Sequence, residues 1–151
     1  MNTKIILIVL GEPNSTFSEI LLKYFKSKKF KKINKKIVLI GSYELFKNQM
    51  ESLKYKMKIN KILDLDNSII RSINILNVNY IFKKAFSGIS NFSSIYIENC
   101  FKLGLKLIKK ENVQALINGP ISKKHFLKKK FPGVTEYIAN KTNSKKPVML
   151  I

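Results

Sequence analysis

Continuous runs of apolar residues alternate along the chain with longer stretches in which apolar residues recur every three or four positions. Continuous runs are typical of strands buried on both faces of a parallel sheet. Three are present, at residues 4–10, 37–41 and 113–117. The spaced pattern predicts amphipathic helices over residues 17–27, 43–57 and 94–110. This alternation without repeats predicts an α/β fold, with a mostly parallel sheet and helices on both faces.

Polar residues stand where these helices are expected to begin. Thr16 and Glu19 have the spacing of a capping box, in which the hydroxyl accepts from a first-turn amide and the carboxylate reaches back. Ser42 is placed to cap the second helix, and Ser93 or Ser94 the third.

The segment between residues 58 and 82 is less regular. Apolar residues between 59 and 65 predict one short strand, and residues 79–82 predict another. Asp64 and Asp66 lie two positions apart, so on a strand they would share a face and could bind a cation. A polar turn beside an ordinary strand is the simpler interpretation.

The strand at 113–117 is followed by two breaks. Asn118-Gly119-Pro120 ends it, a lysine-rich helix follows, and Phe131-Pro132-Gly133 precedes a further element at Thr135. Helix starts at Ser122 and Thr135 would present free amides to an anion, with Lys123 or Lys124 adding charge. Spacing alone favours Ser122 and Thr135 as simple N-caps.

Composition limits the chemistry that the chain can support. The net charge is +20, but Arg71 is the single arginine among 29 basic residues. Specific phosphate and base recognition prefers arginine, so compositional bias explains the charge better than nucleic-acid binding. One cysteine, Cys100, excludes a disulfide framework and suits a buried structural thiol. One histidine, His125, cannot form a histidine cluster.

Several common classes of protein lack support in the sequence. The apolar run near the amino terminus is too short for a signal peptide, and no run approaches the roughly 18 residues of a membrane span. We therefore expect a cytoplasmic protein without membrane contact. Residues 11–19 contain one glycine, which is neither a P-loop nor a dinucleotide fingerprint.

Two stretches resemble the 4-hydroxythreonine-4-phosphate dehydrogenases of pyridoxal phosphate biosynthesis. That family has a strand ending in Thr-Gly-Pro-Ile-Asn-Lys, then Phe-Pro-Gly-His-Thr-Glu-Tyr-Leu and Met-Met-Leu. The corresponding residues here are Asn118 to Lys123, Phe131 to Ile138 and Val148 to Leu150. Near the start, Gly11-Glu12-Pro13-Asn14-Ser15-Thr16-Phe17-Ser18-Glu19 resembles the family's Gly-Asp/Glu-Pro-Ala-Gly-Ile-Gly-Pro-Glu.

The resemblance implies a two-domain α/β fold like the isocitrate and isopropylmalate dehydrogenases, with a cleft between the domains and a homodimeric assembly. It implies oxidation, with decarboxylation, of 4-phosphooxy-threonine by NAD or NADP with a divalent metal. On this basis residues 1–151 form the amino-terminal portion of that fold, with the carboxy-terminal half absent. The apolar residues 147–151 would begin another buried strand, which suggests a truncated or split gene product.

Departures from the family pattern limit what carries over. The family's metal-binding histidines, nicotinamide site and most substrate contacts follow the region matched here. We therefore expect no catalytic or metal-binding residue in this chain, and its cofactor-binding residues stay unknown. The family's substrate-binding histidine before Thr135 is Val134 here, which leaves Thr135 as the transferable substrate contact. His125 matches no family ligand. The expected protein is inactive alone; the alternatives are a non-catalytic phosphometabolite-binding module or a gene remnant.

Overall fold

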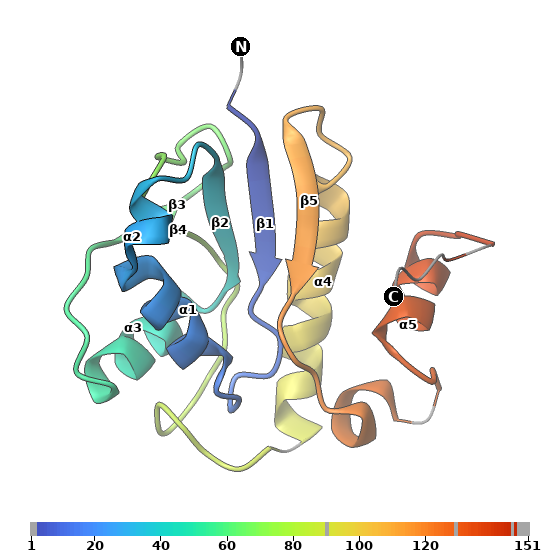
Figure 1. Ribbon diagram of the computed structural model, residues 1–151. Helices are drawn as coiled ribbons and strands as arrows, with labels where there is room; N and C mark the ends of the chain where they lie inside the picture. The colour runs from blue at the N-terminus through green and yellow to red at the C-terminus, as the bar shows by residue number, and fades with distance from the viewer. Residues whose placement is uncertain (1–2, 90, 129, 146, 148–151) are drawn as a thin grey trace.

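The computed structural model describes residues 3–89, 91–128, 130–145 and 147. A five-stranded sheet lies at its centre, in the order β3-β4-β2-β1-β5, and every neighbouring pair is parallel (Figure 1). The strands are β1 (Ile5–Val9), β2 (Lys36–Gly41), β3 (Ile59–Ile62), β4 (Ile73–Asn77) and β5 (Val113–Asn118). The predicted parallel α/β fold is confirmed.

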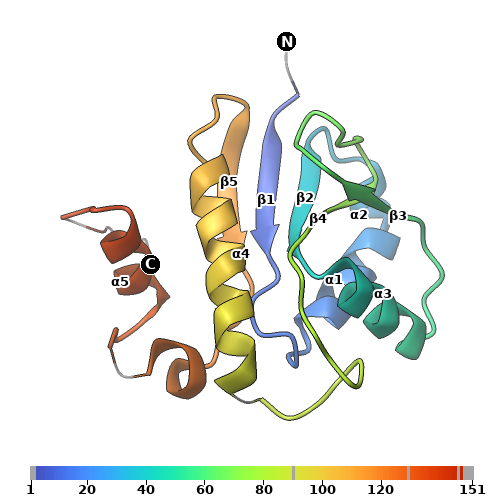
Figure 2. The same cartoon turned by 180° about the vertical axis from the view of Figure 1, so that it is seen from behind.

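Helices cover the sheet from both sides. Three helices lie on one face and α4 lies on the other, as Figures 1 and 2 show from opposite sides. The helices are α1 (Phe17–Lys26), α2 (Lys28–Lys31), α3 (Tyr43–Ser52), η1 (Asn91–Ser93), α4 (Ser94–Leu107), η2 (Lys123–Leu127) and α5 (Val134–Lys141).

Successive side chains of the central strands point to opposite faces of the sheet, which explains why helices pack on both faces. Leu7 and Val9 of β1 belong to the core cluster under α4, whereas Ile8 belongs to the cluster under α1 and α3. Val38 and Leu39 of β2 divide in the same way. Because both faces are apolar, these strands read as continuous hydrophobic runs in the sequence.

Helix starts and ends differ in part from the sequence predictions. The Thr16–Glu19 capping box is wrong: Thr16 precedes α1 without a side-chain cap bond, and Glu19 instead pairs with Lys23 at 2.7 Å. Ser42 does cap α3, since its Oγ accepts from Leu45 N at 3.2 Å. That helix ends at Ser52 rather than near residue 57.

The irregular segment after α3 contains one correct and one wrong strand. β3 forms as predicted, but residues 79–82 are not a strand, and β4 at Ile73–Asn77 was missed. Asn74 interrupts the apolar pattern of β4, although it is fully buried and donates its side-chain amide to Ile37 O at 2.9 Å. The polar-turn interpretation of the two aspartates is confirmed, because Asp64 Oδ1 accepts from the amides of Asp66 and Asn67.

The segment after β5 forms two short helices. The expected lysine-rich helix is a single π-helical turn, η2, and α5 packs its Tyr137 ring on Phe101 of α4 and on Phe126. Residues 148–151, where a further strand was expected, lie outside the described residues. No described helix is long and apolar enough to cross a membrane.

Candidate functional site

The turns that follow β1 and β5 are bonded to each other. Gly119 N donates to Val9 O at 2.7 Å, and Glu12 N donates to Pro120 O at 2.8 Å. Gly11 has φ +71°, and a Cβ there would lie 2.4 Å from Pro120 O. The Gly-Glu-Pro and Asn-Gly-Pro motifs therefore form one packed unit in which Gly11 cannot accept a side chain.

Glu12 joins this unit to the start of α4. The residue is 3% exposed. One oxygen accepts from Ser93 Oγ at 2.9 Å, and the other accepts from Asn14 N at 3.3 Å. A buried carboxylate needs such donors to offset its lost hydration, so Glu12 holds the turn after β1 against η1.

Larger side chains occupy the positions at which the family motif has inner glycines. Phe17 is one of them, and its ring lies against Gly119, 2.6 Å from where a Cβ on that glycine would sit. Asn14, in the same turn, accepts from Ser87 N at 2.9 Å and donates to Gly88 O at 3.3 Å. These contacts fill and fix the turn.

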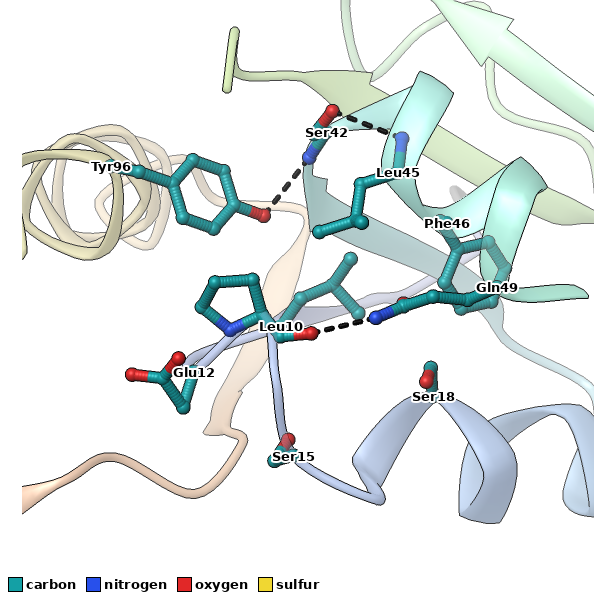
Figure 3. A pocket seen from close by; sticks show the side chains of 10 residues that line it. Leu10, Glu12, Ser15, Ser18, Ser42, Leu45, Phe46, Gln49 and Tyr96 are labelled. Atoms are coloured by element: carbon teal, nitrogen blue, oxygen red, sulfur yellow. Dashed lines mark hydrogen bonds between the residues drawn. The ribbon is translucent and has the colours of Figure 1, made fainter. Parts of the chain in front are cut away.

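A small cavity lies beneath this turn, between α1 and α3 (Figure 3). Its volume is about 10 Å³, which is close to the room that one water molecule needs. Gln49 donates across it to Pro13 O at 2.6 Å, and Ser18 Oγ is buried without a hydrogen-bond partner among the described residues. The cavity beneath the turn thus has no room for a phosphate or a nucleotide.

The single thiol lies deep in the same region. Cys100 is fully buried in α4, and burial raises the pKa of its thiol to about 12. Tyr96, one turn earlier, accepts from Ser42 N at 3.0 Å, and burial raises the pKa of its phenol well above the ordinary value. Cys100 is therefore protonated at neutral pH and poorly suited to nucleophilic chemistry, as its structural interpretation predicted.

The start of α5 is arranged differently. The helix begins at Val134 with Gly133 as N-cap, so Thr135 is its second residue and not its cap. Thr135 is half-buried, and its hydroxyl makes no hydrogen bond to any described residue. Val134 packs against the core cluster under α4. The predicted cap at Ser122 is confirmed, because its Oγ accepts from His125 N at 3.2 Å.

The other candidate groups are not gathered around Thr135. Lys123 and Lys124 line a hollow of about 450 Å³ together with Phe131. A second hollow of about 390 Å³ lies between α4, η2 and α5; Tyr137 and Lys141 are among its lining residues, but Val134 and Thr135 are not. His125 Nδ1 lies 3.0 Å from Asn91 Oδ1, which is a contact between η2 and η1.

One ion pair links α4 and α5, between Glu98 and Lys141, and a second, between Glu98 and Lys102, lies within α4. Burial alone would raise the pKa of Glu98, but Lys141 and Lys102, at 3.3 and 3.4 Å, lower it. Burial, and then the charge of Glu98, raise the pKa of Tyr137 to about 12.

The described residues do not provide a ligand set for a resident metal. Across the described ranges, no three side chains of the types His, Cys, Asp and Glu lie together as a metal-binding group. The cavity beneath the turn after β1 has a volume of only about 10 Å³. A metal site with three such ligands would need residues beyond those described.

Known proteins place this arrangement in a family. A family profile described as pyridoxal phosphate biosynthetic protein PdxA matches residues 32–151. The chain belongs to the PdxA family. The resemblance to this family is thereby confirmed; the match includes the motifs after β5, whereas the motif at residues 11–19 precedes the matched range. A search of curated proteins found no match to the sequence.

Solved structures related to the PdxA family have the same fold. The 4-hydroxythreonine-4-phosphate dehydrogenase of Burkholderia phymatum aligns with a TM-score of 0.82 at 19% identity, covering 95% of this chain and 45% of that one. The enzyme of Klebsiella pneumoniae aligns with a TM-score of 0.79 at 17% identity, covering 93% and 45%. This chain spans less than half the length of these relatives.

Proposed function

We propose that residues 1–151 serve as the amino-terminal portion of a 4-hydroxythreonine-4-phosphate dehydrogenase, and that this chain alone does not turn over substrate. The whole enzyme would oxidise and decarboxylate 4-phosphooxy-threonine in pyridoxal phosphate biosynthesis, as a homodimer in the cytoplasm. The observation that carries the proposal is the PdxA match over residues 32–151, in a chain that covers 45% of its structural relative.

In this proposal the chain contributes substrate binding at α5. Thr135 Oγ1 has no partner among the described residues, and the first amides of α5 have no partner within the helix. Both can donate to an anionic oxygen of the phosphorylated substrate, which the positive end of the helix also favours. Val134 cannot form the hydrogen bond that a histidine makes, so we expect weaker binding than in a chain with that histidine.

The remaining chemistry would come from outside the described residues. In the complete enzyme, NAD or NADP would supply the hydride acceptor and a divalent metal would supply Lewis-acid chemistry, and no described residue is assigned to hold either group. The described residues of this chain would position the phosphorylated end of the substrate.

Calorimetry and activity together test the proposal. The purified chain is titrated with 4-phosphooxy-threonine and assayed with NAD, NADP and Mg²⁺, Mn²⁺ or Zn²⁺. We expect weak binding, no turnover, and loss of binding in Thr135→Ala. Thr142→Ala is the matched control, because that hydroxyl bonds Ile138 O at the other end of α5. Turnover by the chain alone would refute its inactivity, and equal binding by both variants would refute the role of Thr135.

A non-catalytic phosphometabolite-binding module is the second candidate. The Thr135 hydroxyl, which has no partner among the described residues, favours this candidate, since binding can persist where the family histidine is lost. Tight binding of a phosphorylated amino acid by the chain alone would favour this candidate. No heat at millimolar ligand would instead favour a gene remnant.

A further inference from the structure

The hollow between α4, η2 and α5 has the dimensions of a small ligand site. Its volume is about 390 Å³, which falls within the range of small-molecule sites in proteins. Figures 1 and 2 show α5 beside α4, with η2 on the segment that leads from β5 to α5. Val134 and Thr135 are not among the lining residues. The hollow is therefore not the substrate-binding site proposed at the start of α5.

Tyr137 contributes an unsatisfied hydroxyl to the lining of this hollow. The residue is 5% exposed, and its Oη has no hydrogen-bond partner among the described residues. Burial of a hydroxyl without a partner costs free energy, so such groups are normally bonded to another group or to water. The ring is fixed by edge contacts with Phe126 and Phe131, whose centroids lie 5.1 and 5.5 Å away. Tyr137 thus holds in place a donor that no described residue uses.

Glu98 shows on which side of Tyr137 this hydroxyl lies. Burial, and then the charge of Glu98, raise the pKa of Tyr137 to about 12. The second effect requires the carboxylate to lie near the phenol oxygen, although no hydrogen bond joins the two groups. Glu98 also lines the hollow. The unsatisfied hydroxyl and the carboxylate therefore border the same space.

Positive charge predominates around the hollow. Lys128 and Lys130 line it from the end of η2 and the segment that follows, and Lys141 lines it from α5. Glu98 is the single acidic residue among the described lining residues, and it is already paired with Lys141 at 3.3 Å and with Lys102 at 3.4 Å. Cations gathered in a concave site attract anions more strongly than the same charges on a flat surface. The lining therefore favours an anion over a cation.

We propose that this hollow binds a phosphate group, either as the free anion or as a small phosphate ester. Tyr137 Oη would donate to one phosphate oxygen, and Lys128 and Lys130 would donate to the others. A hydrogen bond to a charged acceptor is stronger than one to a neutral acceptor, so a phosphate would satisfy the hydroxyl better than water. The site goes beyond the proposed dehydrogenase function, since it uses no residue that was assigned to the substrate.

Nuclear magnetic resonance titrations of the whole 151-residue chain test the proposal. Inorganic phosphate and glycerol 3-phosphate are added separately at an ionic strength kept constant with sodium chloride, so that general screening does not change. We expect saturating shifts of backbone amides around the hollow, with Ile95, Glu98 and Phe131 as reporters. The probe that saturates at the lower concentration identifies the free anion or the ester as the preferred form.

A tyrosine variant isolates the contribution of the hydroxyl. Tyr137→Phe should weaken phosphate binding by about tenfold or more, because a hydrogen bond to a charged acceptor is lost. The variant should fold, since the ring contacts stay and the hydroxyl has no described partner to lose. Tyr24→Phe is the matched control, because Tyr24 packs against the core cluster on the other face of the sheet. It should change the affinity less than about twofold.

Charge variants test the sign of the ligand. Lys130→Gln should weaken binding by about threefold, whereas Lys29→Gln, at an exposed position of α2, should have less effect. Glu98→Gln should strengthen binding by about threefold, because it removes the negative charge and releases Lys141. Weaker binding in Glu98→Gln would show that the hollow takes a cation and would overturn the proposal.

Other results would also refute the phosphate site. Absence of saturating shifts with both probes, or equal effects of Tyr137→Phe and Tyr24→Phe, would each overturn it. Thr135→Ala should change the phosphate affinity less than about twofold, and a loss equal to that of Tyr137→Phe would place the anion at the start of α5 instead.

Calorimetry with 4-phosphooxy-threonine separates this inference from the proposed function. Heat that depends on Thr135, without phosphate binding in the hollow, refutes this inference alone. Phosphate binding that depends on Tyr137, without Thr135-dependent heat, refutes the α5 site alone.

Discussion

The turn after β1 and the first turn of α5 carry the two motifs of the resemblance, and they have changed in opposite ways. At the first, Phe17 and Asn14 fill and fix the turn, and the cavity below it has about 10 Å³. At the second, Val134 packs into the core while the Thr135 hydroxyl stays without a partner among the described residues. A family motif can thus persist as packing in one place and as a possible ligand contact in another, and only the neighbouring side chains distinguish the two.

The largest expected effect concerns the turn after β1, which is packed against the turn after β5. Gly11→Ala would place a Cβ 2.4 Å from Pro120 O at φ +71°, against backbone that cannot move aside. We expect a loss of about 3 kcal/mol in the free energy of unfolding, measured in urea. Gly88→Ala is the control, because no atom lies within 4 Å of its added Cβ. Equal stability of the two variants would mean that the turns after β1 and β5 are not packed as described.

The next effect concerns the carboxylate that fixes this turn. Glu12→Ala removes the acceptor of Ser93 Oγ and Asn14 N in a buried site, which should cost about 2 kcal/mol in urea unfolding. Glu19→Ala, at an exposed ion pair with Lys23, should cost about 0.5 kcal/mol or less. Similar losses for both would show that the Glu12 contacts contribute little.

A pH titration of stability tests how well the core around Cys100 excludes water. The pKa of Cys100 is raised from 9.0 to about 12, so its contribution to stability is full below pH 9 and is lost as the pH rises toward 12. From pH 8 to 10 we expect the wild type to lose about 1.4 kcal/mol more than Cys100→Ala, measured by urea unfolding at each pH. Parallel curves would show that the thiol reaches solvent in the folded state.

The sequence predicted the layers of the fold because each central strand is apolar on both faces. Prediction from the sequence failed where polar residues take part in buried hydrogen bonds. Asn74 concealed β4, although its amide is satisfied inside the fold. Glu12 gave no local signal either, because its partner Ser93 lies 81 residues away. Thr135 was found through the family motif, but its place as second helix residue depends on Gly133 serving as the cap.

The smallest effects compare the two neighbours at the start of α5. Val134→Ala should lower the free energy of unfolding by about 1 kcal/mol, since it removes part of a half-buried core contact. Thr135→Ala should change stability by less than about 0.5 kcal/mol, because no described residue bonds its hydroxyl. The same variants are titrated with 4-phosphooxy-threonine, where the order should reverse: Thr135→Ala abolishes the heat and Val134→Ala preserves it. A substantial loss of stability in Thr135→Ala would mean that the hydroxyl has a structural role. The contrast between the two motifs would then be wrong.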